Sequence, residues 1–119
     1  MIQNIQERLG STTVTILDGE TVSTPANLSG TSLVSIDIPA NFDGTGMTFQ
    51  VGTTDSSGAV NYKQYRRLID GTAVTAIVGA DGAYATEIGD FAGYNYIKLV
   101  SVTAQTGDIT ITLKTIPIN

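Results

Sequence analysis

The segment 109–116 constrains the fold of this chain most, because apolar and polar residues alternate over its first six positions. One side of an extended strand would carry Ile109, Ile111 and Leu113, while threonine and lysine occupy the positions between them. A strand with one face on a core and the other in water has this pattern. The segment therefore predicts a sheet that packs on a hydrophobic core.

The preceding run, residues 94–103, is apolar on both faces, and residues 104–108 between the two runs are rich in turn formers. Two β-rich runs around a short turn-forming loop predict a hairpin. Apolar side chains on both faces predict a central strand that is covered on both sides. We therefore expect the last third of the chain to form a hairpin whose first strand lies in the middle of the fold.

Further strands are predicted by the same alternation, at residues 12–17, 31–38, 47–53, 59–67, 72–78 and, as an extended piece or a single helical turn, 84–88. The turn formers at 55–58 predict a hairpin between the third and fourth of these. Asp-Gly, a strong turn signal, recurs at four places along the chain. Seven or eight short strands with such turns predict an all-β, single-domain antiparallel β-sandwich, for which a jelly-roll is one candidate topology.

The composition restricts the chemistry that this chain can perform. Its 119 residues suffice for one domain, and the net charge of −5 argues against nucleic acid and against an anionic membrane surface as partners. The chain has no His and no Cys, so it lacks a Ser-His-Asp triad and the usual zinc ligands. We therefore expect no enzymatic activity, no metal and no cofactor.

The acidic residues offer one alternative to this expectation, because two carboxylates can hydrolyse a glycosidic bond. Four of the eight aspartates, Asp18, Asp43, Asp70 and Asp81, precede glycine, where Asp typically bonds to the backbone of its own turn. Asp37 and Glu87 lie outside those turns and are the best candidates for such a pair.

The first ten residues differ from the rest of the chain. Ile2, Ile5 and Leu9 recur at helical spacing and would form one apolar stripe on a short helix. Residues 1–10 are predicted to be an N-terminal arm or short helix, and residues 11–119 the β-sandwich domain. The arm is either a docked or frayed chain end or a segment that becomes ordered on a partner.

One basic and aromatic patch stands out in the middle of the chain, where residues 62–67 contain half of the six basic residues. Its candidate partner-binding residues are Tyr62, Tyr65, Arg66 and Arg67. Arg and Tyr are enriched at protein–protein hot spots, whereas stacking on single-stranded nucleic acid fits poorly with an acidic chain. A solvated strand end is the alternative without a function.

The stretch 91–99, Phe-Ala-Gly-Tyr-Asn-Tyr-Ile-Lys-Leu, resembles a phrase found in virion proteins of tailed bacteriophages. In those proteins a strand that ends in Ile-Thr-Leu follows, as it does here at 111–113. The segments 36–40, 47–51 and 55–58 resemble the same proteins' strand with a Pro-Ala loop, aromatic strand and glycine turn. The likeness spans roughly residues 31–113; Tyr94 stands where the phrase often has Trp, and the loops within 59–90 match less well.

The resemblance implies a capsid decoration, or cement, protein that binds the major capsid protein on the virion surface and stabilises the assembled head. Such a protein is made in the cytoplasm of the bacterial host and often acts as a homo-oligomer, here expected to be a dimer or trimer. A carbohydrate-binding β-sandwich of a tail fibre or receptor-binding protein is the alternative. In that case a platform for sugars would come from Tyr62, Tyr65, Tyr84 and Tyr94.

Overall fold

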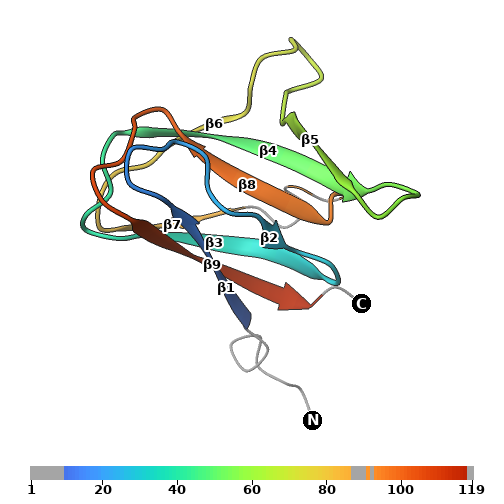
Figure 1. Cartoon of the computed structure of the whole chain (residues 1–119), viewed down its shortest axis with the longest axis horizontal. Helices are drawn as coiled ribbons and strands as arrows, with labels where there is room; N and C mark the ends of the chain where they lie inside the picture. Colours follow the sequence, from blue (N-terminus) through green and yellow to red (C-terminus); the bar gives the residue numbers. More distant parts are fainter. Residues whose placement is uncertain (1–9, 87–90, 92, 118–119) are drawn as a thin grey trace.

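Two antiparallel sheets pack face to face in the computed structural model, which describes residues 10–86, 91 and 93–117 (Figure 1). The first sheet contains, in spatial order, β1 (Gly10–Ile16), β9 (Ile109–Pro117), β3 (Thr31–Ile38) and β7 (Gly82–Ala85). The second contains β2 (Ala26–Asn27), β8 (Tyr96–Ser101), β4 (Gly46–Thr54) and β5 (Val60–Gln64), and β6 (Thr75–Ile77) also pairs with β4. The predicted all-β sandwich is confirmed.

The strand pairs are nested within one another along the sequence. β1 pairs with β9, β2 with β8, β3 with β7, and β4 with both β5 and β6. The chain is thus a long hairpin rolled up on itself, and the rolling adds the contacts of β9 with β3 and of β8 with β4. This strand order is that of a jelly-roll.

The predicted hairpin between the last two strands is wrong. β8 pairs with β2 and β4 in one sheet, whereas β9 pairs with β1 and β3 in the other. Residues 102–108 therefore cross from one sheet to the opposite one. Both strands point apolar residues at the same core from opposite sides. In the sequence this arrangement gives the same alternation of apolar and polar residues as two neighbouring strands of one sheet.

The core lies between the sheets and is formed by alternate residues of the long strands. Ile109, Ile111 and Leu113 are completely buried, as their alternation predicts. In β8 only one face is in the core. Ile97 and Leu99 are completely buried, whereas Tyr96, Lys98 and Val100 on the other face are partly exposed. The expectation that this strand is covered on both sides is therefore wrong, because the described part of the chain forms only two layers.

Several boundaries differ from the predicted ones. Gly10 already belongs to β1, and the turn-rich connection 20–30 contains the short strand β2. β6 is shorter than the segment 72–78, because residues 72–74 pair with residues 65–67 and not with β4. The hairpin of β4 and β5 around 55–58 is confirmed by five consecutive residue pairs from Gln50–Gln64 to Thr54–Val60.

Candidate functional site

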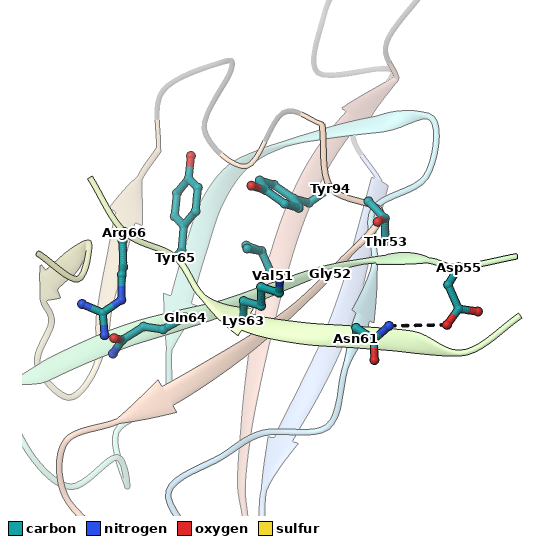
Figure 2. Close-up of a pocket in the computed structure, with 10 residues that line it drawn as sticks. All are labelled: Val51, Gly52, Thr53, Asp55, Asn61, Lys63, Gln64, Tyr65, Arg66 and Tyr94. Carbon is teal, nitrogen blue, oxygen red and sulfur yellow. Dashed lines mark hydrogen bonds between the residues drawn. The ribbon is translucent and has the colours of Figure 1, made fainter. Parts of the chain in front are cut away.

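A groove of about 520 Å³ lies along the β4–β5 hairpin (Figure 2). Val51 and Lys63 lie at its floor, and the rings of Tyr65 and Tyr94 stand side by side as one wall. Asn61 and Asp55 lie at one end and Arg66 at the other. We call this feature the tyrosine groove.

The groove floor follows from strand register and from one glycine. Val51 pairs with Lys63, so both side chains lie on the same face of the sheet, and Lys63 stays exposed because β5 is at the sheet edge. Gly52 allows β4 and β5 to approach closely. A Cβ atom at Gly52 would lie 2.7 Å from the carbonyl oxygen of Asn61.

The wall is the outer end of a row of four aromatic rings that begins in the core. Buried Phe49 and Phe91 meet edge to face with their centroids 5.0 Å apart, and Tyr65 lies 5.0 Å from Phe91. Tyr94 then meets Tyr65 edge to face at 5.9 Å and is 40% exposed. Edge-to-face contacts of this kind favour a fixed ring geometry. The groove therefore has a rigid aromatic wall with one accessible ring.

The Asp55 carboxylate is occupied by its own turn. Its Oδ1 accepts hydrogen bonds from the N–H and hydroxyl of Ser57 (2.8 and 2.7 Å) and from the N–H of Ala59 (3.0 Å). The bonds from Ser57 are the largest cause of the lowered pKa of Asp55. Asp55 therefore orders the hairpin end of the groove and holds Asn61, whose Nδ2 donates to Oδ2 at 3.4 Å.

A second feature, residues 65–74, projects from the second sheet; we call it the 65–74 hairpin (Figure 1, yellow-green). Its first two residues, Tyr65 and Arg66, also line the groove. Arg66 and Ala73 form a bridge, and the Arg67 N–H donates to the Thr72 carbonyl at 2.7 Å. At the tip Leu68 is fully exposed and Ile69 is 85% exposed. Large apolar side chains thus point to solvent from an ordered turn.

The structure separates the residues of the predicted patch 62–67. Tyr65 and Arg66 line the groove and Arg67 lies in the 65–74 hairpin, but the ring of Tyr62 packs beneath the Lys98 ammonium at 4.3 Å, away from the groove. Burial, followed by the nearby Tyr96, raises the pKa of Tyr62. Arg66 is not free, because its guanidinium donates to the Gly71 carbonyl at 2.9 Å.

Other candidates from the sequence lie elsewhere. Tyr84 is partly buried against the core, and its hydroxyl accepts a hydrogen bond from the Gly79 N–H at 2.8 Å. Ile2, Ile5 and Leu9 of the predicted arm lie outside the described residues.

Leu68 and Ile69 were not predicted as functional residues, because the Asp70-Gly71 pair beside them predicts only a turn. The available signal is the pair of bulky aliphatic residues directly before Asp70-Gly71. Turns usually carry small or polar residues, so such a pair is unusual at that place.

The acid pair considered for glycoside hydrolysis is not brought together within the described residues, since Glu87 lies outside them. Asp37 forms an ion pair with Lys114 at 3.2 Å and accepts a hydrogen bond from the Ser35 hydroxyl. Among the described residues no three acidic side chains gather as a metal site would require. No helix in that part of the chain could span a membrane.

Comparison with known proteins gives a fold likeness and no family. No protein-family model matches the chain, and no curated protein matches it. Among solved structures, the SPBc2 prophage-derived protein YomS aligns with a TM-score of 0.53 and 12% identity over 98% of both chains. At this identity the likeness concerns the fold.

Two other structures align more weakly. A protein of the disulfide-linked pili that form Bacillus endospore appendages aligns with a TM-score of 0.38 and 10% identity over 92% of this chain and 88% of its own. The Yersinia pseudotuberculosis-derived mitogen aligns with a TM-score of 0.38 and 11% identity over 93% of this chain and 86% of its own. At these TM-scores neither likeness bears on function.

Proposed function

We propose that this chain is a non-enzymatic structural protein of a bacteriophage particle, which binds the major capsid protein on the outer surface of the head and stabilises the assembled shell. The observation that carries this proposal is the whole-length fold likeness to a prophage-derived protein, 98% of each chain. The resemblance of residues 91–99 to virion proteins supports it independently.

The architecture suits such a role. Nested strand pairs and a completely buried core give a stable body, and surface attachment needs no catalytic group. A dimer or trimer that engages several sites of a repeating shell can hold firmly even where each contact is small, because linked contacts raise the effective concentration.

The direct test is the copy number of this chain in gradient-purified particles of its source, measured by quantitative mass spectrometry. The proposal expects a number comparable to that of the major capsid protein. A small multiple that matches tail or vertex symmetry would contradict shell decoration and indicate a fibre or connector. Absence from particles would overturn a virion role.

The tyrosine groove favours a second candidate function, carbohydrate binding. Sugar rings stack on exposed aromatic faces, and their hydroxyl groups take hydrogen bonds from amides and cations. Tyr94 provides the ring, and Asn61, Lys63 and Gln64 provide polar groups around it. This reading fits a module of a tail fibre or receptor-binding protein.

A glycan array probed with the purified chain tests the second candidate. Replacement of Tyr94 by Ala should abolish binding, whereas Tyr62→Ala is the matched control because Tyr62 packs under Lys98, away from the groove. No bound glycan, or equal loss in both variants, would contradict a sugar site in the groove.

A further inference from the structure

The tip of the 65–74 hairpin is ordered by its own hydrogen bonds. The Gly71 N–H donates to the Arg67 carbonyl at 2.8 Å. Oδ1 of Asp70 accepts from the N–H and the hydroxyl of Thr72 at 3.0 and 2.7 Å. These bonds fix the backbone around Leu68 and Ile69 without using either side chain.

A fixed tip with two outward aliphatic side chains is prepared for docking. Burial of Leu or Ile against a partner is favourable, and a preorganised loop loses little conformational freedom when it docks. Inside the folded chain these two side chains contribute little burial, since Leu68 is fully exposed and Ile69 is 85% exposed. Their placement is therefore better explained by a partner than by the stability of the domain.

Charge near the tip indicates the character of that partner. Arg66 and Arg67 lie in this hairpin and are two of the chain's six basic residues, although the whole chain has a net charge of −5. The negative charge of Asp70 is turned towards Thr72. A complementary surface would have an apolar pocket with acidic groups at its rim.

We infer that the 65–74 hairpin is the anchor by which the chain attaches to the head shell. Leu68 and Ile69 enter an apolar pocket of the shell protein, and Arg67 pairs with an acidic group at the rim. The identity of this partner rests on the proposed function. The hairpin is the attachment element, and the rest of the sandwich is the body that it holds in place.

The size and charge of the contact favour a shell protein over the two other possible partners, which are a second copy of the chain and an anionic bilayer. Two side chains at a tip bury far less than the roughly 1,000 Å² that a stable interface between two copies needs. On a shell, by contrast, a dimer or trimer of the chain would engage several such contacts at once. An anionic bilayer would attract the basic groups at the tip but repel a chain whose net charge is −5.

Shells that lack the chain, titrated with purified variants, test the inference. Leu68→Ser and Ile69→Ser should each weaken binding roughly 10- to 100-fold, and Arg67→Ala should weaken it less. Leu17→Ser and Val102→Ser are matched controls, because these aliphatic residues are 49% and 63% exposed and lie outside the hairpin. The controls should bind as the wild type does, and the thermal unfolding midpoint of each tip variant should stay unchanged.

The outcomes separate the two proposals. A wild-type chain that does not bind shells refutes the proposed function and this inference with it. If the wild type binds shells and the Leu68→Ser, Ile69→Ser double variant binds within threefold of it, the anchor alone is refuted. The anchor is also refuted if binding falls equally in the two control variants.

A photo-crosslinking residue at position 68 adds a direct readout of the partner. Crosslinks to the shell protein support the inference. Crosslinks only to a second copy of the chain overturn it. Binding to phosphatidylglycerol vesicles that depends on Leu68 and Ile69, without binding to shells, overturns it as well.

Discussion

The side-chain amide of Gln105 holds the backbone of Asp43, a residue 62 positions earlier in the chain. Its Oε1 accepts the Asp43 N–H at 2.8 Å, and its Nε2 donates to the Asp43 carbonyl at 2.9 Å. The same Nε2 donates to Ser101 and Thr103, and Gln105 is only 1% exposed. One buried amide thus ties the β3–β4 loop to residues 102–108, which cross between the sheets.

Replacement of Gln105 by Ala should destabilise the domain by about 2–4 kcal/mol, because two backbone groups of Asp43 lose their partner. Urea unfolding measures this change. Gln64→Ala is the matched control: Gln64 is exposed, so its replacement should change the free energy of unfolding by less than about 0.5 kcal/mol. Equal effects of the two variants would contradict the structural role of Gln105.

Three hydrogen-bonded aspartates should make the stability of the fold depend on pH in the acid range. Hydrogen bonds from Thr106, Ser57 and Thr72 lower the pKa of Asp43, Asp55 and Asp70, respectively. A carboxyl whose pKa is lower in the folded than in the unfolded state stabilises the fold above its unfolded pKa and loses this effect as the pH falls through the folded pKa. Stability should therefore decline as the pH falls below about 4.

The midpoint of thermal unfolding, recorded from neutral pH into acid, measures this decline. In a variant with Asn at all three aspartates the midpoint at neutral pH should be lower than in the wild type, and the further loss in acid should be smaller. An acid decline as steep as that of the wild type would show that other groups cause it.

Gly52 predicts a steric effect at the groove floor. A Cβ atom at this position would lie 2.7 Å from the Asn61 carbonyl oxygen and 2.8 Å from Cγ1 of Val60, so Gly52→Ala must push β5 away from β4. We expect a loss of about 1–3 kcal/mol, measurable by thermal unfolding. Thr53→Ala, at the next and exposed position of β4, should have a smaller effect. A neutral Gly52→Ala would mean that the two strands separate without strain.

Phe91 links the core to the groove wall. It is 5% exposed and contacts both Phe49 and Tyr65, so Phe91→Ala should cost about 3–5 kcal/mol and release the Tyr65 ring. Chemical unfolding gives the energy, and near-ultraviolet circular dichroism reports the loss of fixed tyrosine geometry. Tyr94→Ala, at the exposed end of the row, should cost less. A larger loss for Tyr94 than for Phe91 would contradict the order of the row.

Alternation along single strands predicted which residues are buried, and Ile109, Ile111 and Leu113 are examples. It did not predict strand partners, because the pattern identifies the core-facing side without naming the sheet, and the hairpin expected at 94–116 failed for this reason. Local patterns in the sequence did not predict the tyrosine groove either. Tyr65 and Tyr94 become neighbours only through Phe91 and the folding of the sheets.

The resemblance of 91–99 to virion proteins identified a stretch that does contribute to the site, through Phe91 and Tyr94. It did not identify the 65–74 hairpin, since the loops within 59–90 match those proteins less well. Exposure of Leu68 and Ile69 depends on how their turn is oriented, and sequence spacing alone does not contain that information.

The position of β9 sets the order in which the sheet can be completed as the chain is synthesised. This strand is the last of the described strands to emerge, yet it lies between β1 and β3. Until β9 is synthesised, the facing edges of β1 and β3 have no strand to pair with. Unpaired strand edges of this kind can pair with other chains. A copy that ends before Ile109 keeps both edges open, so premature termination should yield aggregates rather than a smaller folded domain.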